Sequence, residues 1–238
     1  MNLAPNFIGG REGRLQYESG QRCFNDAHTI AAFQAVADLA PYLPNSPETL
    51  SALMSREHFL QGQAVMFMGG SWDIIKLEKE KPDFKWSVFA VPAPAGQPEY
   101  ITYHSDFGVA LNAASKHKAA AKVFLEWLTK PQTAALFSYE LPGFFPMHQK
   151  QLKLGNEHAQ TFRNLNHGRG TDVRWAYPKL MEGIPNGQYL MSKTTRAVIQ
   201  GKQTPQEAAN TMQKWLAQWF EPAQRCHQAQ KTSEASNR

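Results

Sequence analysis

The sequence predicts an α/β fold with a parallel sheet, and three observations support this prediction. Residues 64–68 form a short apolar run between Gly62 and Gly69, which is typical of a strand buried on both faces. Amphipathic stretches of helical period lie on both sides of this run. The run also ends in a Gly-Gly-Ser-Trp turn at residues 69–72, and open α/β sheets bind their ligands beyond the carboxyl ends of their strands.

The remaining elements follow from local signals along the chain. Residues 1–24 are rich in glycine and are expected to form loops around at most a short strand. The polar tail, residues 228–238, is expected to be disordered. Helices are expected at 27–40, from about 48 to 62, after Trp72, from Ser115 to 128, at 131–139, 156–167 and 188–200, and after Thr204; strands are expected at 64–68, 86–91 and in two pieces between 100 and 111.

Capping residues and apolar stripes locate several of these helices. Asn25 or Asp26 suits the N-cap of the helix at 27–40. The sequence Thr-Pro-Gln-Glu at 204–207 is a capping box with proline at the first helical position, which predicts a helix start. The stripe of apolar residues at 120, 123, 124, 127 and 128 predicts a core position for Trp127, and the helix after Thr204 is expected to bury Trp215 and Trp219.

Composition indicates a globular protein and limits its partners. The 238 residues are 42% hydrophobic and 19% charged, which suits one large domain or two small ones. The net charge of +5 invites a nucleic-acid partner, but the arginines form no recognition helix, zinc finger or aromatic strand signature. No apolar stretch has the length of a membrane span, and residues 1–20 lack the apolar core of a signal peptide. We expect a monomer without a nucleic-acid partner or a membrane span.

The sequence shows no pattern for a metal, a cofactor or catalysis. The eight histidines form no H-E-x-x-H motif, and no glycine-rich loop completes a dinucleotide or P-loop signature. The trio His104, Ser105 and Asp106 is contiguous, and alternating side chains of an extended segment do not make a catalytic relay. Cys23 and Cys226 would pair only if the two ends of the chain meet, which the sequence leaves open. We predict a protein that is not an enzyme.

Aromatic residues in two tight loops are the candidate ligand contacts. The glycines before Trp72 lack a Cβ and allow the backbone to approach a ligand, so Trp72 is either a ligand platform or a core residue. At residues 141–147, two prolines stiffen the backbone around Gly143. Phe144 and Phe145 in this loop form either a hydrophobic plug or a ligand platform.

Five stretches of the chain, in this order and spacing, resemble the bacterial extracellular solute-binding proteins of ABC sugar importers, the maltose-binding-protein-like group. They are FLQGQAVMFMGGSW at 59–72, FAVPAPAG at 89–96, FGVALNAASKHKAAAKVFLEWL at 107–128, LPGFFP at 141–146 and TRAVIQGKQTPQEAANTMQKWL at 195–216.

The resemblance implies a periplasmic-binding-protein-like type II fold, in which two α/β lobes grip the ligand in the cleft between them. Residues 1–102 and 158–238 would belong to the second, C-terminal lobe, and residues 103–157 to the first. The family's signal peptide and most of its first lobe are expected to be missing from this chain. With its natural partners largely missing, the apolar stripe around Trp127 is then expected to face water.

The resemblance also implies a function and a site. The chain would be the substrate-binding component of an ABC importer, periplasmic or lipid-anchored outside the cell in its full-length parent. It would bind a sugar or oligosaccharide without a cofactor and deliver it to membrane permease subunits. Trp72 of the G-x-W turn would stack on the sugar, and Asp106, where the family usually has a glycine, would accept hydrogen bonds from hydroxyl groups. The implied ligand-binding residues are Gly70, Trp72, Asp106, Gly143, Phe144, Phe145, Gln188 and Tyr189.

Two alternative functions use other residues. An anionic or phosphorylated solute would be bound by Arg169 or Arg174. An enzyme acting on glycans would need a pair of carboxylates, and Asp73 and Asp106 are the only acids near the candidate cleft residues.

Overall fold

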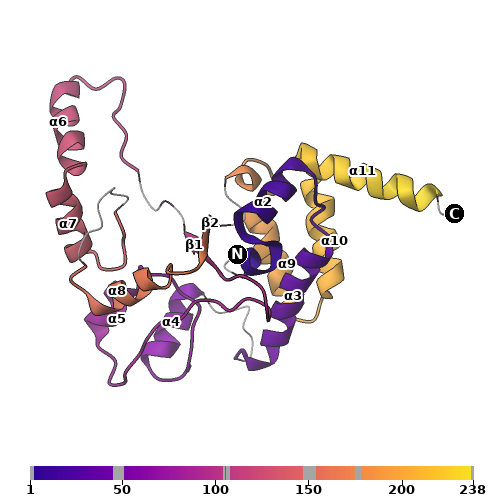
Figure 1. Cartoon of the computed structure of the whole chain (residues 1–238), viewed down its shortest axis with the longest axis horizontal. Helices are drawn as coiled ribbons and strands as arrows, with labels where there is room; N and C mark the ends of the chain where they lie inside the picture. The colour runs from indigo at the N-terminus through magenta and orange to yellow at the C-terminus, as the bar shows by residue number, and fades with distance from the viewer. Residues whose placement is uncertain are drawn as a thin grey trace. The chain divides into compact units, whose positions relative to one another are not determined.

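The computed structural model describes residues 3–44, 51–103, 105, 108–146, 154–174 and 178–236, with side chains to residue 229. In these ranges the chain forms helices and a two-stranded parallel sheet (Figure 1). Two compact units are distinguished: unit 1 comprises Met1–Thr49, Ala90–His104 and Gly168–Arg238, and unit 2 comprises Leu50–Phe89 and Ser105–His167. The lobe assignment implied by the resemblance has other boundaries and stays a prediction.

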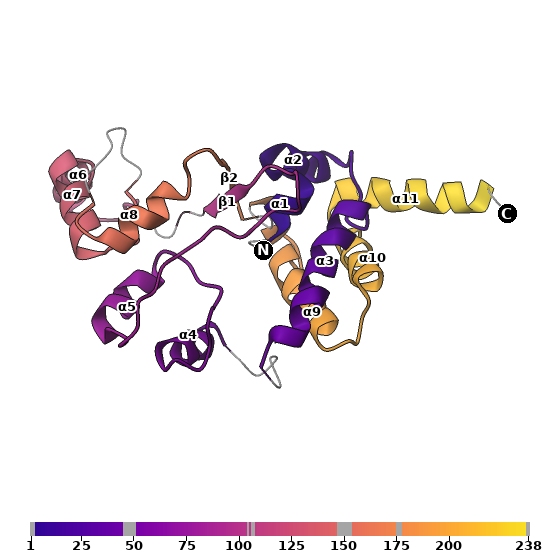
Figure 2. The same cartoon turned by 60° about the horizontal axis from the view of Figure 1, so that its bottom comes forward.

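Unit 1 is built on a layer of packed helices. Helices α3, α9 and α10 contact one another, and Figure 2 shows them side by side. Its elements are α1 (Ala4–Ile8), α2 (Gly10–Ser19), α3 (Ala27–Leu39), η1 (Ala40–Tyr42), β1 (Tyr100–Tyr103), β2 (Gly170–Val173), η3 (Lys179–Met181), α9 (Gly187–Ile199), α10 (Pro205–Leu216) and α11 (Glu221–Ser236).

The core of unit 1 lies between these helices. Leu190 from α9 and Met212 and Leu216 from α10 are fully buried, together with Tyr17 and Phe24 from the N-terminal region. Burial of each large apolar side chain contributes roughly 1.5–3 kcal/mol, so this cluster supplies much of the stability of the unit. The predicted packing role of the two tryptophans is confirmed, since Trp215 and Trp219 pack against the cluster while partly buried.

The predicted capping box begins α10. The Thr204 hydroxyl accepts a hydrogen bond from Glu207 N at 3.2 Å, and the Glu207 carboxylate accepts one from Thr204 N at 2.8 Å. Asp26 caps α3 in the same way by accepting from Thr29 N. These contacts satisfy backbone N–H groups that have no partner inside the helix.

Replacing Thr204 by alanine is expected to lower the free energy of unfolding by about 0.5–2 kcal/mol, because the cap of α10 is lost. Urea denaturation followed by circular dichroism measures the change. The control is Thr204→Ser, which keeps the hydroxyl and is expected to retain most of the stability. Equal stability of Thr204→Ala and the wild type would show that the capping box contributes nothing.

The parallel sheet of unit 1 pairs β1 with β2 from Tyr100 opposite Gly170 to Tyr103 opposite Val173. Helix α2 is fixed to β2 by Arg14, whose guanidinium donates to both carboxylate oxygens of Asp172 at 2.8 and 2.9 Å. The hydrogen bond to Asp172 raises the pKa of Arg14 despite its burial. The predicted α/β class with a parallel sheet is therefore confirmed, although this sheet is small.

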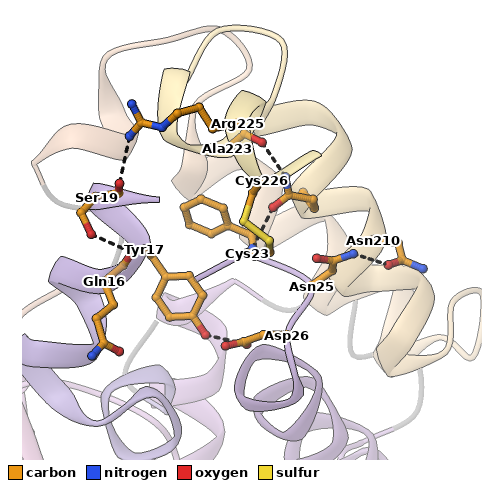
Figure 3. The surroundings of a disulfide bond; sticks show 12 residues. Gln16, Tyr17, Ser19, Cys23, Asn25, Asp26, Asn210, Ala223, Arg225 and Cys226 are labelled. Atoms are coloured by element: carbon orange, nitrogen blue, oxygen red, sulfur yellow. Dashed lines mark hydrogen bonds between the residues drawn. A yellow bond between two sulfur atoms is a disulfide. The ribbon is translucent and has the colours of Figure 1, made fainter. Parts of the chain in front are cut away.

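A disulfide between Cys23 and Cys226 fixes α11 to the segment that follows α2 (Figure 3). The two Cα atoms are 5.5 Å apart, so the two distant cysteines, whose pairing the sequence left open, do pair. Hydrogen bonds surround the bridge: Gln213 accepts from Phe24 N and donates to the Ala223 carbonyl, both at 2.8 Å. The bridge and Gln213 thus join three separate segments of unit 1.

Unit 2 contains α4 (Ala52–Leu60), α5 (Asp73–Glu80), α6 (Lys118–Leu128), α7 (Pro131–Glu140) and α8 (Glu157–Asn164), close to the predicted helices. The strands predicted at 64–68 and 86–91 and after residue 107 are wrong over the described residues, which form no strand there. Val65 is 91% exposed and Met66 67% exposed. An apolar run becomes a buried strand only where another strand satisfies its backbone groups, and no described residue of unit 2 pairs with this one.

Three further predictions need correction. Residues 4–19 form α1 and α2 and not loops; Gly9 and Gly20 end these helices in the left-handed conformation. Residues 228–236 of the tail predicted to be disordered belong to α11, which runs to Ser236. Trp127 is 44% exposed and not in a core, because α6 half-buries Ala121, Leu125 and Leu128 instead. Ala120, Val123, Phe124 and Trp127 are exposed, which agrees with the expectation that the apolar stripe around Trp127 faces water.

Candidate functional site

The Gly-Gly-Ser-Trp turn at residues 69–72 begins helix α5 in unit 2. Asp73 N donates to the Gly70 carbonyl at 3.0 Å, and Ile74 N donates to the Ser71 carbonyl at 3.2 Å. The buried Asp73 side chain closes the turn by accepting from Gly70 N at 3.0 Å. Backbone and side-chain hydrogen bonds thus both hold the turn, and Trp72 is its last residue.

The two glycines leave room for neighbouring side chains, which occupy the space where a Cβ would be. A Cβ on Gly70 would lie 2.3–2.5 Å from three carbons of the Trp72 six-membered ring. A Cβ on Gly69 would lie 2.5 Å from Asp73 Oδ2 and 2.6 Å from the Phe67 ring. The Trp72 ring therefore lies directly over the Gly70 backbone, and the indole remains 39% exposed.

The Gly143 loop packs against this same turn. Gly143 is buried with φ +95°, and a Cβ there would lie 1.9 Å from the Ser71 carbonyl oxygen. Phe144 N donates to the Leu141 carbonyl at 3.1 Å, which closes the loop. Phe145 is 39% exposed. The structure thus brings together the two aromatic loops that the sequence analysis selected independently.

An ion pair holds the turn from the side of α4. Arg56 Nη1 donates to Asp73 Oδ1 at 2.9 Å, with the two side chains 19% and 10% exposed. The sequence analysis missed Arg56 because it lies 17 residues before Asp73, a separation that no local periodicity connects. The same analysis named Asp73 only as a possible acid, and the structure shows both its carboxylate oxygens engaged.

The other end of α5 is fixed to α8. His158 Nδ1 lies 2.7 Å from Glu78 Oε1, and the His158 ring stacks on Trp86 with ring centroids 3.6 Å apart. Burial by itself raises the pKa of Glu78, but hydrogen bonds from Asn156 and His158 outweigh it and leave the pKa below its usual value. The Glu78 carboxylate is therefore stabilised in its charged form, and α5 is anchored at both ends.

The other predicted site residues lie elsewhere. Gln188 and Tyr189 belong to the first turn of α9 in unit 1, where Asn186 caps the helix by accepting from Tyr189 N at 2.8 Å. Tyr189 is 56% exposed. Asp106 lies outside the described residues. Unit 2 therefore contains one described cluster of predicted site residues: Gly70, Trp72, Gly143, Phe144 and Phe145.

Two other kinds of site were sought over the described part of the chain. No group of three or more histidine, cysteine, aspartate or glutamate side chains there is arranged to hold a metal ion. No helix in the described ranges has the length and apolar character needed to cross a membrane.

Solved structures of other proteins share this fold. A chitin oligosaccharide binding protein superposes with a TM-score of 0.72 at 18% identity, covering 90% of this chain and 54% of its own. A sugar transporter from Bacillus licheniformis, solved in complex with stachyose, gives a TM-score of 0.64 at 16% identity, covering 89% of this chain and 54% of its own. The chain thus spans about half the length of these proteins. No curated protein sequence matches it.

The sequence itself matches one protein family. Residues 6–135 match the family described as bacterial extracellular solute-binding protein. That range includes the Gly-Gly-Ser-Trp turn and helices α2 to α6. Together with the shared fold, this match confirms the resemblance to solute-binding proteins and the predicted fold class. The chain belongs to the bacterial extracellular solute-binding protein family.

Proposed function

We propose that this chain is part of the substrate-binding component of an ABC importer, which binds a sugar or oligosaccharide and delivers it to membrane permease subunits. The observation that supports the proposal most is the packing of the Gly143 loop on the Gly-Gly-Ser-Trp turn. It holds two partly exposed aromatic rings, Trp72 and Phe145, on neighbouring rigid loops. Sugar rings present apolar C–H faces to such aromatic side chains and hydroxyl groups to polar neighbours.

Two further observations support this proposal. The two structural neighbours are named for a chitin oligosaccharide and a sugar, and one contains stachyose. The disulfide between Cys23 and Cys226 suits an oxidising location outside the cytosol, in the periplasm or on the cell surface.

We also propose that residues 1–102 and 158–238 belong to one lobe and 103–157 to the other, with Asp106, Gln188 and Tyr189 contributing to the ligand site.

The alternatives have less support from the described residues. Arg169, a candidate for binding an anion, has its guanidinium Nε 2.5 Å from the Glu99 carboxylate. Asp73, a candidate acid for glycan hydrolysis, uses both carboxylate oxygens to hold the turn. Each group already has a structural partner that a ligand or a reaction would have to displace.

Isothermal titration calorimetry of the chain with neutral and phosphorylated sugars tests the proposal. Chitin-derived oligosaccharides, stachyose and a sugar phosphate are titrated at low and at high salt. The proposal predicts binding of a neutral oligosaccharide with little change between the two salt concentrations, because no ionic contact has to be screened. Binding of the sugar phosphate alone, weakened steeply by salt, would favour the anionic solute, and release of shorter sugars would favour an enzyme.

Replacing Trp72 by alanine is expected to weaken oligosaccharide binding by about 1–3 kcal/mol, which corresponds to about 5- to 150-fold in Kd. The matched control is Trp127→Ala, because Trp127 is also a tryptophan of unit 2 and is similarly exposed, 44% against 39%. Calorimetry should show a loss of affinity for the first variant alone. Equal affinities of Trp72→Ala and Trp127→Ala would show that Trp72 is a packing residue and not a ligand contact.

A further inference from the structure

We infer that Arg56 and Asp73 are positioning residues that hold the Trp72 ring in place for a ligand, although neither is predicted to touch one. This inference rests on the proposed function, because it assumes that Trp72 contacts the solute. It assigns a role in binding to a pair that the sequence analysis did not connect.

First, the Asp73 carboxylate accepts two hydrogen bonds, one from the turn and one from α4. Its Oδ2 accepts from Gly70 N at 3.0 Å, and its Oδ1 accepts from Arg56 Nη1 at 2.9 Å. One oxygen thus fixes the backbone of the turn, and the other fixes the carboxylate to α4. Since the Trp72 ring lies directly over Gly70, any movement of the Gly70 backbone moves the surface on which that ring rests.

The second step is the burial of the pair. Asp73 is 7% exposed, and the Arg56 side chain is 19% exposed. Arg56 Nε is buried and has no hydrogen-bond partner among the described residues. The Asp73 carboxylate is the nearer of two that face the partly buried Arg56 guanidinium, since Glu57 Oε1 lies 4.0 Å from Arg56 Nη2. Breaking the Arg56–Asp73 pair leaves Arg56 with only this longer contact to a more exposed carboxylate, so the short pair with Asp73 fixes the geometry.

The third step is the effect on binding. An aromatic ring that is already fixed loses little conformational entropy when a ligand stacks on it. If the pair is removed, the turn gains freedom, and the Trp72 ring has to be ordered again with each binding event. The pair therefore acts on affinity through Trp72, and its effect should disappear when Trp72 is absent.

A double-mutant cycle tests this dependence. Asp73→Ala is expected to weaken binding of the oligosaccharide identified by calorimetry by about tenfold in the wild-type background. In the Trp72→Ala background the same change is expected to have almost no effect. Asp73→Asn keeps an oxygen for Gly70 N but loses the charge opposite Arg56, so an intermediate loss is expected. The control is Glu80→Gln, which breaks the exposed Lys76–Glu80 pair of the same helix and should leave Kd unchanged.

A second readout needs no ligand. Acrylamide quenching of the Trp72 fluorescence, taken as the difference between each protein and its Trp72→Phe counterpart, reports access to the indole. Quenching is expected to increase in Asp73→Ala and Arg56→Gln and to remain unchanged in Glu80→Gln. If Asp73→Ala does not fold, Asp73→Asn and Arg56→Gln give the same comparison.

Two results would overturn the inference: an equal loss of affinity from Asp73→Ala with and without Trp72, or unchanged Trp72 quenching in both pair variants. Failure of the proposed function looks different, because the wild type would then bind no oligosaccharide while the quenching still reported the pair.

Discussion

The double substitution Cys23→Ala and Cys226→Ala is expected to lower the free energy of unfolding by about 3–5 kcal/mol. The two cysteines are 203 residues apart, and closing so long a loop removes much entropy from the unfolded chain. Loss of the bridge also removes the covalent link between α11 and the segment around Phe24, which leaves the hydrogen bonds of Gln213 and the one from Arg225 to the Ser19 carbonyl. Few single interactions in unit 1 have an expected effect of this size.

Guanidinium denaturation followed by circular dichroism measures this change. The control is Asn25→Ala, which removes the exposed hydrogen bond from Asn25 to Asn210 near the bridge and is expected to cost at most about 1 kcal/mol. The wild type treated with a reducing agent should behave like the double variant. An unchanged denaturation midpoint in the double variant would contradict the role given to the bridge.

Replacing Gly143 by alanine is expected to destabilise unit 2 by about 2–6 kcal/mol and to weaken oligosaccharide binding. Two costs add: backbone strain of about 1–3 kcal/mol, because φ is +95°, and a steric cost of about 1–3 kcal/mol, because the new Cβ would lie 1.9 Å from the Ser71 oxygen. Relief of that clash has to displace the turn that holds Trp72. Stability and affinity should therefore fall together.

Gly62→Ala separates the two costs. Gly62 also belongs to unit 2 and has φ +69°, but among the described residues no atom beyond its chain neighbours lies within 4 Å of its ideal Cβ position. The variant therefore suffers the strain without the clash, and it should lose less stability and keep its affinity. Urea denaturation and calorimetry of both variants check this comparison. Equal losses in Gly143→Ala and Gly62→Ala would contradict the close packing of the Gly143 loop on the turn.

Helices were predictable because their signals are local. The capping box at Thr204 and Glu207 and the N-cap at Asp26 lie within three residues of their partners, and the structure confirms both. The prediction of a strand at 64–68 failed because an apolar run does not show whether a second strand will pair with it. The prediction of loops in residues 1–24 failed for a similar reason, because glycine is common both in loops and at the ends of helices.

The two aromatic loops of the candidate site were predictable from the sequence, and the Arg56–Asp73 ion pair that holds one of them was not. Trp72 and the Gly143 loop were selected from short motifs, and the structure packs Gly143 against the Ser71 carbonyl of the turn that carries Trp72. Their roles as ligand residues stay predictions. The Arg56–Asp73 pair and the disulfide depend on residues brought together by the fold, over separations that no sequence period marks.

Hydrogen–deuterium exchange with and without an oligosaccharide tests the central claim most directly, namely that a neutral sugar binds against the Trp72 turn and the Gly143 loop. Chitin-derived oligosaccharides and stachyose are the ligands, with Trp72→Ala as the control. The account predicts slower exchange at residues 69–73 and 141–146 in the presence of the bound sugar, and a smaller change in the control. Sugar binding that leaves exchange in both segments unchanged, or that protects Trp72→Ala equally, would contradict it.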